Sequence, residues 1–353
     1  MMKEEGAFRT GASRPGAVKR KGVSMVPEAL VKTSFLGGEA TLPLVIEPEI
    51  ENVNLPVWAA SNRARIEAEL LKYGAILFRG FNMETVQQFE QLACAVSLKL
   101  LDYKERSSPR SEVGHGVYTS TDYPANQIIH FHNEQSYSDC WPMKLWFFCL
   151  QPAVEGGATL IADGREVLRR ISAQTRERFE QKQVLYVRNY GDNMGLDWKT
   201  AFQTTEKSEV ESYCRRAGIA FEWRGGDHLR TRQVFPAIVA HPKTGEPVWF
   251  EHTAFFHVSN LETTVREMLL TEFDEQDLPF NTYYADGSPL TDDVLHEIRE
   301  AYAQSAVRFP WRQRDVLLID NMLTSHGRES FAGPRRIVVA MTELHYRRDA
   351  AAI

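Results

Sequence analysis

One short motif of the chain indicates metal-binding chemistry, because a histidine and a glutamate are separated by a single residue in His132-Asn133-Glu134. The motif ends an apolar segment, and residues 127–132 are predicted to form a strand. Side chains at positions i and i+2 of an extended chain point to the same side, so the imidazole of His132 and the carboxylate of Glu134 can bind one ion. The motif therefore supplies two ligands.

A third ligand is predicted at His326, which follows the buried strand predicted over residues 315–320 and precedes Gly327. A strand in that place delivers a side chain to the rim of a sheet. Two histidines and one carboxylate on one face of an octahedral ion are the ligand set of non-haem Fe(II) oxygenases. Three protein ligands and a water also suit a zinc hydrolase, so the ligand types alone leave both chemistries open.

Further motifs follow the first one in a defined order: Gly156-Gly157-Ala158-Thr159, then His326, and ten residues later Arg336 within Pro334-Arg335-Arg336-Ile337. In order and spacing, these motifs resemble the taurine/2,4-D dioxygenase (TauD/TfdA-like) family of Fe(II)/2-oxoglutarate oxygenases. The resemblance extends from Gly74 to Glu343.

This resemblance implies an enzyme that uses Fe(II), 2-oxoglutarate and O2, and that couples decarboxylation of 2-oxoglutarate to succinate and CO2 with oxidation of a substrate. The residues implied as iron ligands are His132, Glu134 and His326, and those implied to hold the distal carboxylate of 2-oxoglutarate are Thr159 and Arg336. A planar guanidinium can bind a carboxylate through two hydrogen bonds, and a neighbouring hydroxyl adds a donor.

Departures from the family pattern limit the classes of substrate that we expect. The taurine enzyme binds its sulfonate with an arginine four residues after the 2-oxoglutarate arginine, and Ala340 stands at that place here, which disfavours a sulfonate. Glu134 in place of the more usual aspartate resembles the clavaminate-synthase and syringomycin-type branches, which often modify amino acids, free or on carrier proteins. Because halogenating relatives lack the carboxylate ligand, halogenation is disfavoured.

We therefore expect hydroxylation of an unactivated C–H bond in an amino acid or an amino-acid-derived molecule of secondary metabolism, which a carrier protein can present. Desaturation, epoxidation and cyclisation start from the same oxidant and stay open. A metal-dependent hydrolase and a catalytically silent jelly-roll binding protein are the alternatives from other classes. The predicted substrate contacts are Tyr118, Thr121, Gln135, Arg188, Asn189, His252 and Phe255, and the residues predicted to support the ligands are His130 and Asn321.

The elements that position these residues form a β-rich core with helices. Strands are predicted over residues 74–80, 127–132, 143–150, 158–162, 183–190, 315–320 and 336–341, and helices over 56–73, 83–101, 166–181, 206–217, 261–272 and 290–304. We predict a mainly β fold with flanking helices, a double-stranded β-helix of the jelly-roll, cupin-like kind. Residues 1–40 are expected to form a flexible basic arm, and residues 41–353 one domain whose insertion at about 192–310 is a lid.

Composition excludes several function classes. The 353 residues are 43% hydrophobic and 25% charged, as in ordinary globular proteins. With 41 Lys and Arg against 47 Asp and Glu the net charge is −6, which makes nucleic acid a poor partner. No apolar run approaches the roughly 20 residues of a membrane span, and the four scattered cysteines favour a reducing cytoplasm. A small-molecule substrate is therefore expected; the oligomeric state is left open.

Overall fold

The larger of two facing sheets carries the core of the protein. The computed structural model describes residues 30–36, 41–102, 111–120, 123–191 and 196–347. In spatial order the strands of the larger sheet are β1 (Val31–Phe35), β2 (Leu44–Pro48), β3 (Ala75–Phe78), β17 (Val316–Asp320), β7 (Cys140–Gln151), β20 (Arg336–Tyr346), β5 (Val117–Thr119) and β4 (Glu112–Gly114). All neighbouring pairs are antiparallel except β2 and β3, which are parallel.

The smaller sheet lies against the inner face of the larger one. Its order is β16 (Ala306–Phe309), β9 (Thr159–Asp163), β18 (Thr324–Arg328) and β6 (Ile129–His132), and a short pair is formed by β8 (Glu155–Gly156) and β19 (Phe331–Ala332). Between the sheets, Phe147, Leu317 and Val339 of the larger sheet share one buried cluster with Ile161 and Phe309 of the smaller. Two antiparallel sheets are thus packed face to face without closing into a barrel.

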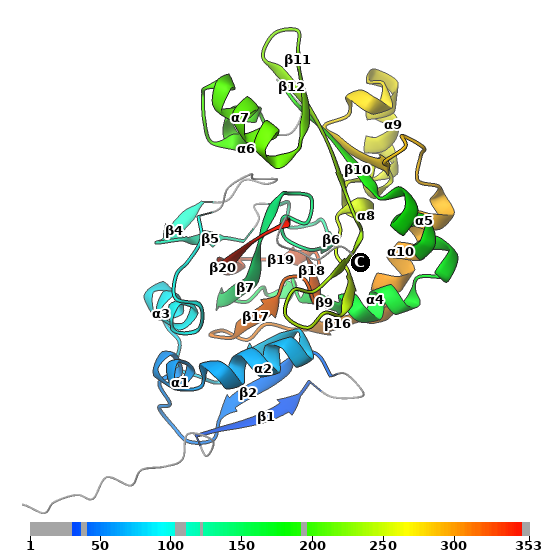
Figure 1. Cartoon of the computed structure of the whole chain (residues 1–353). Coiled ribbons are helices and arrows are strands. Elements are labelled where there is room, and N and C mark those ends of the chain that lie inside the picture. The colour runs from blue at the N-terminus through cyan, green and yellow to red at the C-terminus, as the bar shows by residue number, and fades with distance from the viewer. Residues whose placement is uncertain (1–29, 37–40, 103–110, 121–122, 192–195, 348–353) are drawn as a thin grey trace, which may run out of the picture.

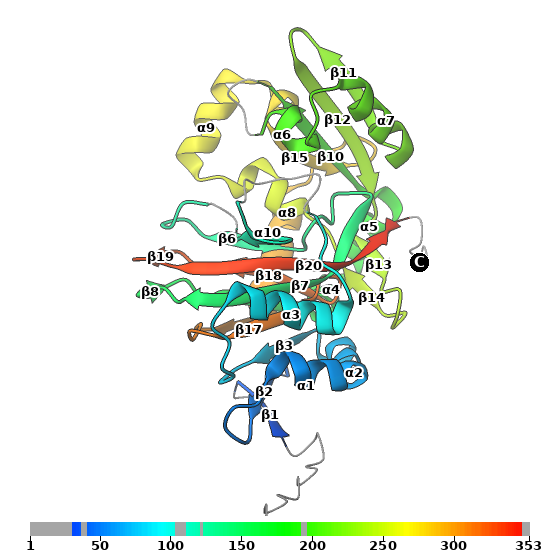
Figure 2. The same cartoon turned by 90° about the vertical axis from the view of Figure 1, so that its left-hand side faces the viewer.

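Helices cover the outer face of the larger sheet. They are α1 (Leu55–Ser61), α2 (Arg63–Tyr73) and α3 (Val86–Ser97), and Figure 2 shows α3 lying across β7 and β20. Phe89 of α3 stacks on Phe148 of β7 with ring centroids 5.4 Å apart. Because β20 is buried on both faces, Val338 and Ala340 contact this helical layer while Ile337 and Val339 face the other sheet.

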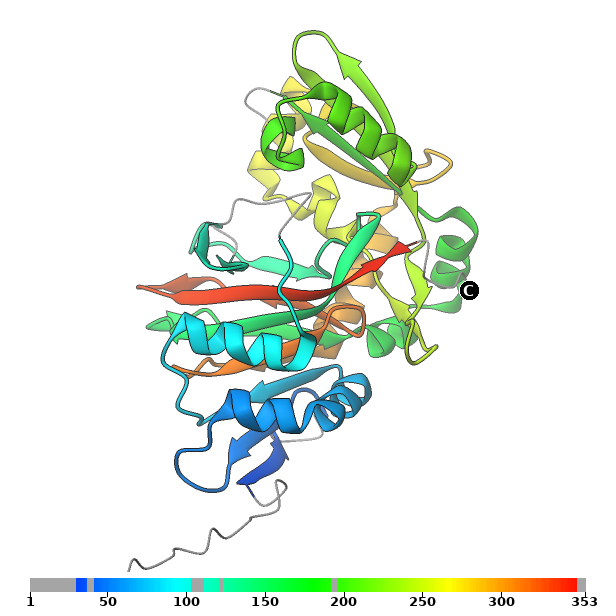
Figure 3. The ribbon, with the colours of Figure 1, turned by 60° about the vertical axis from the view of Figure 1, so that its left-hand side comes forward.

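A third sheet stands above the rim of the sandwich (Figures 1 and 3). Its order is β11 (Ala220–Arg224), β12 (His228–Phe235), β10 (Val184–Tyr190) and β15 (Phe280–Tyr284). The remaining elements are α4 (Gly164–Arg170), α5 (Ala173–Lys182), α6 (Trp198–Phe202), α7 (Lys207–Ala217), β13 (Ile238–Ala240), β14 (Pro247–Trp249), α8 (Thr253–Phe256), η2 (Val258–Asn260), α9 (Thr263–Glu272), η3 (Glu275–Asp277) and α10 (Asp292–Ser305). One buried cluster joins Ala162 of β9, Tyr186 of β10 and Ile298 of α10, so this sheet is continuous with the core.

Some sequence expectations change in the structure. Most of the predicted arm lies outside the described residues, but its described part, 30–36, contains β1, which pairs with β2 and buries Val31. The region 192–310 contains the strands β11 to β16, which the sequence did not predict, and β16 belongs to the sandwich. None of the helices in the described part of the chain has the length and apolar content needed to cross a membrane.

Candidate metal and 2-oxoglutarate site

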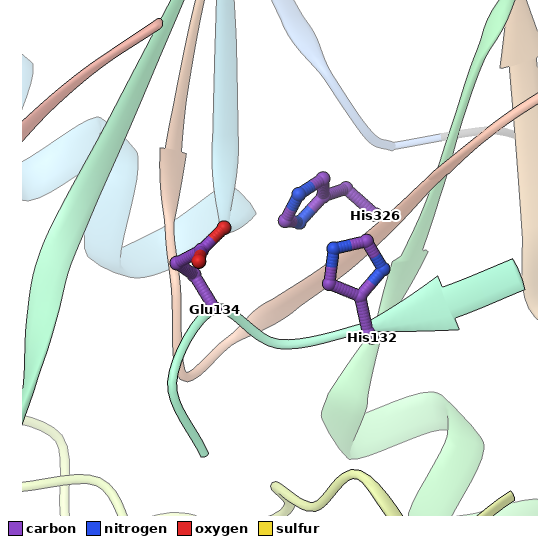
Figure 4. A group of neighbouring side chains, drawn as sticks. All are labelled: His132, Glu134 and His326. Atoms are coloured by element: carbon purple, nitrogen blue, oxygen red, sulfur yellow. The ribbon is translucent and has the colours of Figure 1, made fainter. Parts of the chain in front are cut away.

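Three predicted ligands converge at the rim of the smaller sheet. Each of His132, Glu134 and His326 offers one ligand atom, and these atoms all lie within 4.8 Å of one another. Figure 4 shows the two imidazoles and the carboxylate directed toward a common point. Two neutral imidazoles and one carboxylate form a donor set that fits a divalent iron ion and leaves other coordination positions open.

Strand pairing places the two histidines together. His132, the last residue of β6, is the register partner of His326 in β18, and their ring centroids are 4.3 Å apart. The neighbouring Gly327 permits this approach, because a Cβ there would lie 2.7 Å from the carbonyl oxygen of Ile129. A glycine directly after His326 is therefore required for β18 and β6 to lie this close together.

Hydrogen bonds fix the orientation of the ligands. Nδ1 of His132 lies 2.9 Å from the carbonyl oxygen of His130, so Nδ1 donates and Nε2 is left as the atom that can bind a metal. His130 thus supports the ligand through its backbone, while its side chain is exposed. Asn321, which the sequence analysis expected to support the ligands, is fully buried and bonds the backbone of Glu134 on both sides.

A cationic cavity adjoins the histidines. It is lined by Ser120, Ile129, His132, Phe147, Thr159, His326, Gly327, Arg328, Arg335, Ile337 and Val339. Burial lowers the pKa of Arg335 to about 10, and the nearby charge of Arg328 acts in the same direction. Burial also lowers the pKa of Arg328. Two guanidiniums in one apolar cavity create a demand for an anion, which a carboxylate meets.

Backbone carbonyls hold both arginines in place. Nη2 of Arg328 donates to the carbonyl oxygens of Pro124 and Gln127, each over 2.8 Å. Nε of Arg335 donates to the carbonyl oxygen of Gly157 over 3.1 Å, and its guanidinium lies 5.5 Å from the ring centroid of Phe331. The hydroxyl of Thr159 accepts from Nε1 of Trp311 over 2.8 Å. Because that bond occupies a lone pair of the oxygen, the hydroxyl hydrogen can point to a carboxylate in the cavity.

Arg336, predicted from the sequence to bind 2-oxoglutarate, does not reach this cavity. It is exposed and pairs with Gln151 at a register shift between β20 and β7, whereas Arg335 lines the cavity. Side chains alternate along a strand, so Arg335, Ile337 and Val339 share the cavity side and Arg336 lies on the other. In the structure it is therefore Arg335, and not Arg336, that faces the cavity.

Aromatic rings surround the other side of the ligands. The ring of His132 lies 4.9 Å from Phe255 and 5.4 Å from His252, centroid to centroid. His252 is 2% exposed, and burial together with the nearby His132 holds its pKa well below its usual value, so its ring is neutral. Nδ1 of His252 lies 3.2 Å from the hydroxyl of Ser136. His252 and Phe255, both predicted as substrate contacts, therefore lie beside the metal cluster.

Four other predicted substrate contacts have four different positions. Arg188 is buried, with its guanidinium 5.0 Å from the rings of Tyr137 and Tyr190. Asn189 instead ties strands together, since its amide donates to the carbonyl oxygen of Leu278 over 2.7 Å and accepts from Arg230 over 2.7 Å. Tyr118 packs in the core between the sheets. Thr121 lies outside the described residues.

A large groove separates α6 and α7 from the ends of β7 and β20 and has a volume of about 1090 Å3. None of the three ligands lines it. Gln135, which follows Glu134 in the chain, lines it and has a left-handed backbone with φ of 57°. Non-glycine residues with this conformation concentrate at functional sites. Further along, the wall includes Ser212 and Tyr213 of α7.

The sequence did not predict three residues that line the cavity, Ser120, Arg328 and Arg335, nor Trp311, which bonds Thr159. Both arginines follow His326 within ten residues, but the sequence offers no sign that their side chains turn inward. Ser120 follows β5 and Trp311 follows β16, so both are remote from the motifs in sequence.

Comparison with known proteins identifies the family. The model of the family described as "Taurine catabolism dioxygenase TauD, TfdA family" matches residues 39–342. The chain therefore belongs to the TauD/TfdA family.

Two curated relatives are similar over most of their length. The chain is 41% identical over 281 residues to the dapdiamide synthesis protein DdaC of Enterobacter agglomerans, covering 80% of this chain and 85% of that protein. It is 28% identical over 317 residues to a clavaminate synthase-like protein of Arabidopsis thaliana, covering 85% and 93%. The predicted family and its clavaminate-synthase-like branch are thereby confirmed.

Solved structures agree on the fold. The PvcB protein from Pseudomonas aeruginosa has a TM-score of 0.55 at 16% identity, covering 93% of this chain and 95% of its own. A second PvcB structure, described as an Fe, alpha-ketoglutarate dependent oxygenase from an isonitrile synthetic pathway, also has a TM-score of 0.55, at 15% identity over 91% and 93%. The predicted jelly roll is confirmed.

These findings define the enzyme class. The protein is an Fe(II)/2-oxoglutarate-dependent dioxygenase whose cosubstrates are 2-oxoglutarate and O2. The hydrolase and the silent binding protein, both left open by the ligand types, are set aside.

Proposed function

We propose that His132, Glu134 and His326 bind the iron, and that Arg335 with Thr159 holds the distal carboxylate of 2-oxoglutarate. The observation that carries this assignment is the pair of guanidiniums, one buried and one half-buried, that line the cavity beside the converging ligands. When bound, iron, 2-oxoglutarate and O2 together supply the oxidising power to cleave an unactivated C–H bond, with succinate and CO2 as coproducts.

The chain itself contributes orientation and exclusion of water. Arg335 fixes one end of the dicarboxylate, and Trp311 orients the Thr159 hydroxyl for a second hydrogen bond. Phe147, Ile337 and Val339 give the cavity apolar walls, which strengthen these charged contacts. Val339 lies four residues after Arg335 and faces the cavity, so the place of a sulfonate-binding arginine holds an apolar side chain, and a sulfonate substrate is disfavoured.

We further propose that the substrate is an amino acid or an amino-acid-derived molecule of a natural-product pathway, and that the reaction is hydroxylation. The relative at 41% identity is named as a dapdiamide synthesis protein, which supports a role of this kind. The family motif admits desaturation, epoxidation and cyclisation as variants, and product analysis separates them.

The size of the groove favours a substrate larger than a free amino acid. Its volume of about 1090 Å3 is slightly above the roughly 300–1,000 Å3 usual for small-molecule sites. An aminoacyl group on a carrier protein would enter with an extended amide-containing arm, and hydroxyl and amide side chains such as Ser212 and Gln203 suit such an arm. In this proposal, the elements inserted within residues 192–310 act as a lid over the mouth of the sandwich.

The substrate proposal is tested by measuring succinate release with Fe(II), 2-oxoglutarate and O2. A panel of free amino acids is compared with the same aminoacyl groups attached to carrier proteins. We expect succinate in proportion to a product that has gained one oxygen atom, and higher kcat/KM for the carrier-bound series. Succinate formed only with substrates of another class would contradict the proposal.

The cosubstrate assignment is tested by a matched pair of neighbouring arginines. Arg335→Ala should raise KM for 2-oxoglutarate on the order of 100-fold, because the distal carboxylate of the cosubstrate would lose its cationic partner inside the cavity. Arg336→Ala should leave this KM within about twofold. The reverse pattern would restore the assignment made from the sequence.

A further inference from the structure

Two asparagines are completely buried between the chain segments that carry the metal ligands. Asn133 lies between His132 and Glu134, and Asn321 lies five residues before His326; both are 0% exposed. A buried amide is costly unless its donors and acceptor are bonded, so the partners of these two side chains indicate what each one holds.

The side chain of Asn321 bonds the backbone of Glu134 in two directions. Its Oδ1 accepts from the N–H of Glu134 over 2.8 Å, and its Nδ2 donates to the carbonyl oxygens of Glu134 over 2.8 Å and of Pro142 over 2.9 Å. Strand β6 ends at His132, so Glu134 lies beyond the ladder that pairs β6 with β18. The amide of Asn321 gives Glu134 the two bonds that a neighbouring strand would give.

Asn133 makes the reciprocal connection. Its Nδ2 donates to the carbonyl oxygen of Asn321 over 2.6 Å, and its Oδ1 accepts from the hydroxyl of Ser325 over 3.0 Å. Ser325 is adjacent to the ligand His326. The residue between the first two ligands is therefore bonded to the residue next to the third.

The segment that carries Asn321 is itself fixed. The N–H of Asn321 donates to the carbonyl oxygen of Met143 over 2.8 Å. One carboxylate oxygen of Asp320 accepts from the N–H groups of Met322 and Leu323, each over 3.0 Å, and the other lies 3.1 Å from Nε2 of the buried His241. The asparagine pair thus connects Glu134 to a rigid turn.

We propose that Asn133 and Asn321 are positioning residues that set the place of the Glu134 carboxylate relative to both histidines before the metal binds. This inference rests on the proposed assignment of His132, Glu134 and His326 as ligands. Fixing the backbone in advance removes an ordering cost from metal binding, and partners of this kind typically change metal affinity by about 10- to 100-fold.

The test is an anaerobic titration of the full-length protein with Co(II), followed by the visible absorption of the bound ion. Asn321→Ala, which removes three side-chain hydrogen bonds, should weaken Co(II) binding by about 10- to 100-fold and alter the spectrum. Ser325→Ala, which removes the bond to Asn133 and leaves Asn321 intact, should weaken Co(II) binding by a few-fold in the same direction. The double variant Asn133→Ala/Asn321→Ala should lose less than the product of the two single losses, because the pair acts together.

The controls distinguish a failure of this inference from a failure of the proposed ligand set. If wild type and His326→Ala bind Co(II) alike, the proposed ligand set is wrong. If wild type binds in a His326-dependent manner while Asn321→Ala has a lowered metal-free Tm but unchanged Co(II) affinity and spectrum, the asparagines have only a structural role and the inference is overturned. Should Asn321→Ala fail to fold, Ser325→Ala decides, and an unchanged affinity in that variant overturns the inference.

Discussion

The chain builds the cavity at Arg335 and the groove at α7 differently: His132 and His326 line the cavity, whereas the groove is connected to the ligands only through Gln135, the chain neighbour of Glu134. The cavity lies between strands of two sheets, and its polar side chains, such as Thr159, are held by buried partners. The groove is walled on one side by the rim of the sandwich and on the other by α6 and α7, where Ser212 is exposed.

This contrast separates a fixed part of the enzyme from a variable one. Side chains on paired strands keep their positions within narrow limits, as a site that always binds the same metal and cosubstrate requires. Helices and loops above a rigid scaffold can change in sequence with little loss of core stability, so they are suited to recognise different substrates. Changes in the cavity should therefore affect every substrate alike, and changes in the groove should affect substrates selectively.

The largest effect is expected from a change in the ligand cluster. His326→Ala should abolish succinate formation and the rise in Tm that added Fe(II) gives the wild type, because a ligand that binds the folded state stabilises it. Thermal unfolding with and without Fe(II) measures this. His228→Ala, at the exposed start of β12, is the matched control and should keep both properties. A metal-dependent rise in Tm that survives in His326→Ala would contradict the site.

A smaller effect is expected from the hydroxyl of the cavity. Thr159→Val keeps the shape but removes one hydrogen bond to a charged group, so KM for 2-oxoglutarate should rise by about 10- to 100-fold. The rise should be the same with every substrate. A change that depends on the substrate would show that cavity and groove are not separate in function.

The smallest effect is expected in the groove. Ser212→Trp should lower kcat/KM for the best substrate roughly 10-fold by crowding the groove, and should leave substrate-independent turnover of 2-oxoglutarate unchanged. Arg215→Trp carries the same side chain elsewhere on α7, at an exposed residue that does not line the groove, and serves as control. Equal losses in the two variants, or loss of the uncoupled turnover, would count against the groove as the substrate site.

The sequence was sufficient to predict that His132, Glu134 and His326 converge, because the signal is local. The spacing of His132 and Glu134 by two residues survives any change in the turn that follows, and His326 is marked by a buried strand before it and a required glycine after it. The same pattern, with its resemblance, was enough to predict the family and the jelly roll.

The choice between Arg335 and Arg336 could not be made in the same way. A half-buried strand reveals its inward face through alternating polar residues, but residues 337–341 are apolar throughout, because β20 is covered by helices on one face and by the other sheet on its second. The alternation that assigns a side chain to a face is then invisible in the sequence. In the third sheet β10 was predicted, over residues 183–190, but β11 and β12 were missed, since these two strands carry charged residues.

The most direct test of the cavity is anaerobic titration of 2-oxoglutarate into the Fe(II) protein, followed by the weak visible absorption of the Fe(II)–2-oxoglutarate chelate. Wild type and Arg336→Ala should reach saturation at similar concentrations, and Arg335→Ala should require on the order of 100-fold more. Equal affinity for 2-oxoglutarate in wild type and Arg335→Ala would contradict the account.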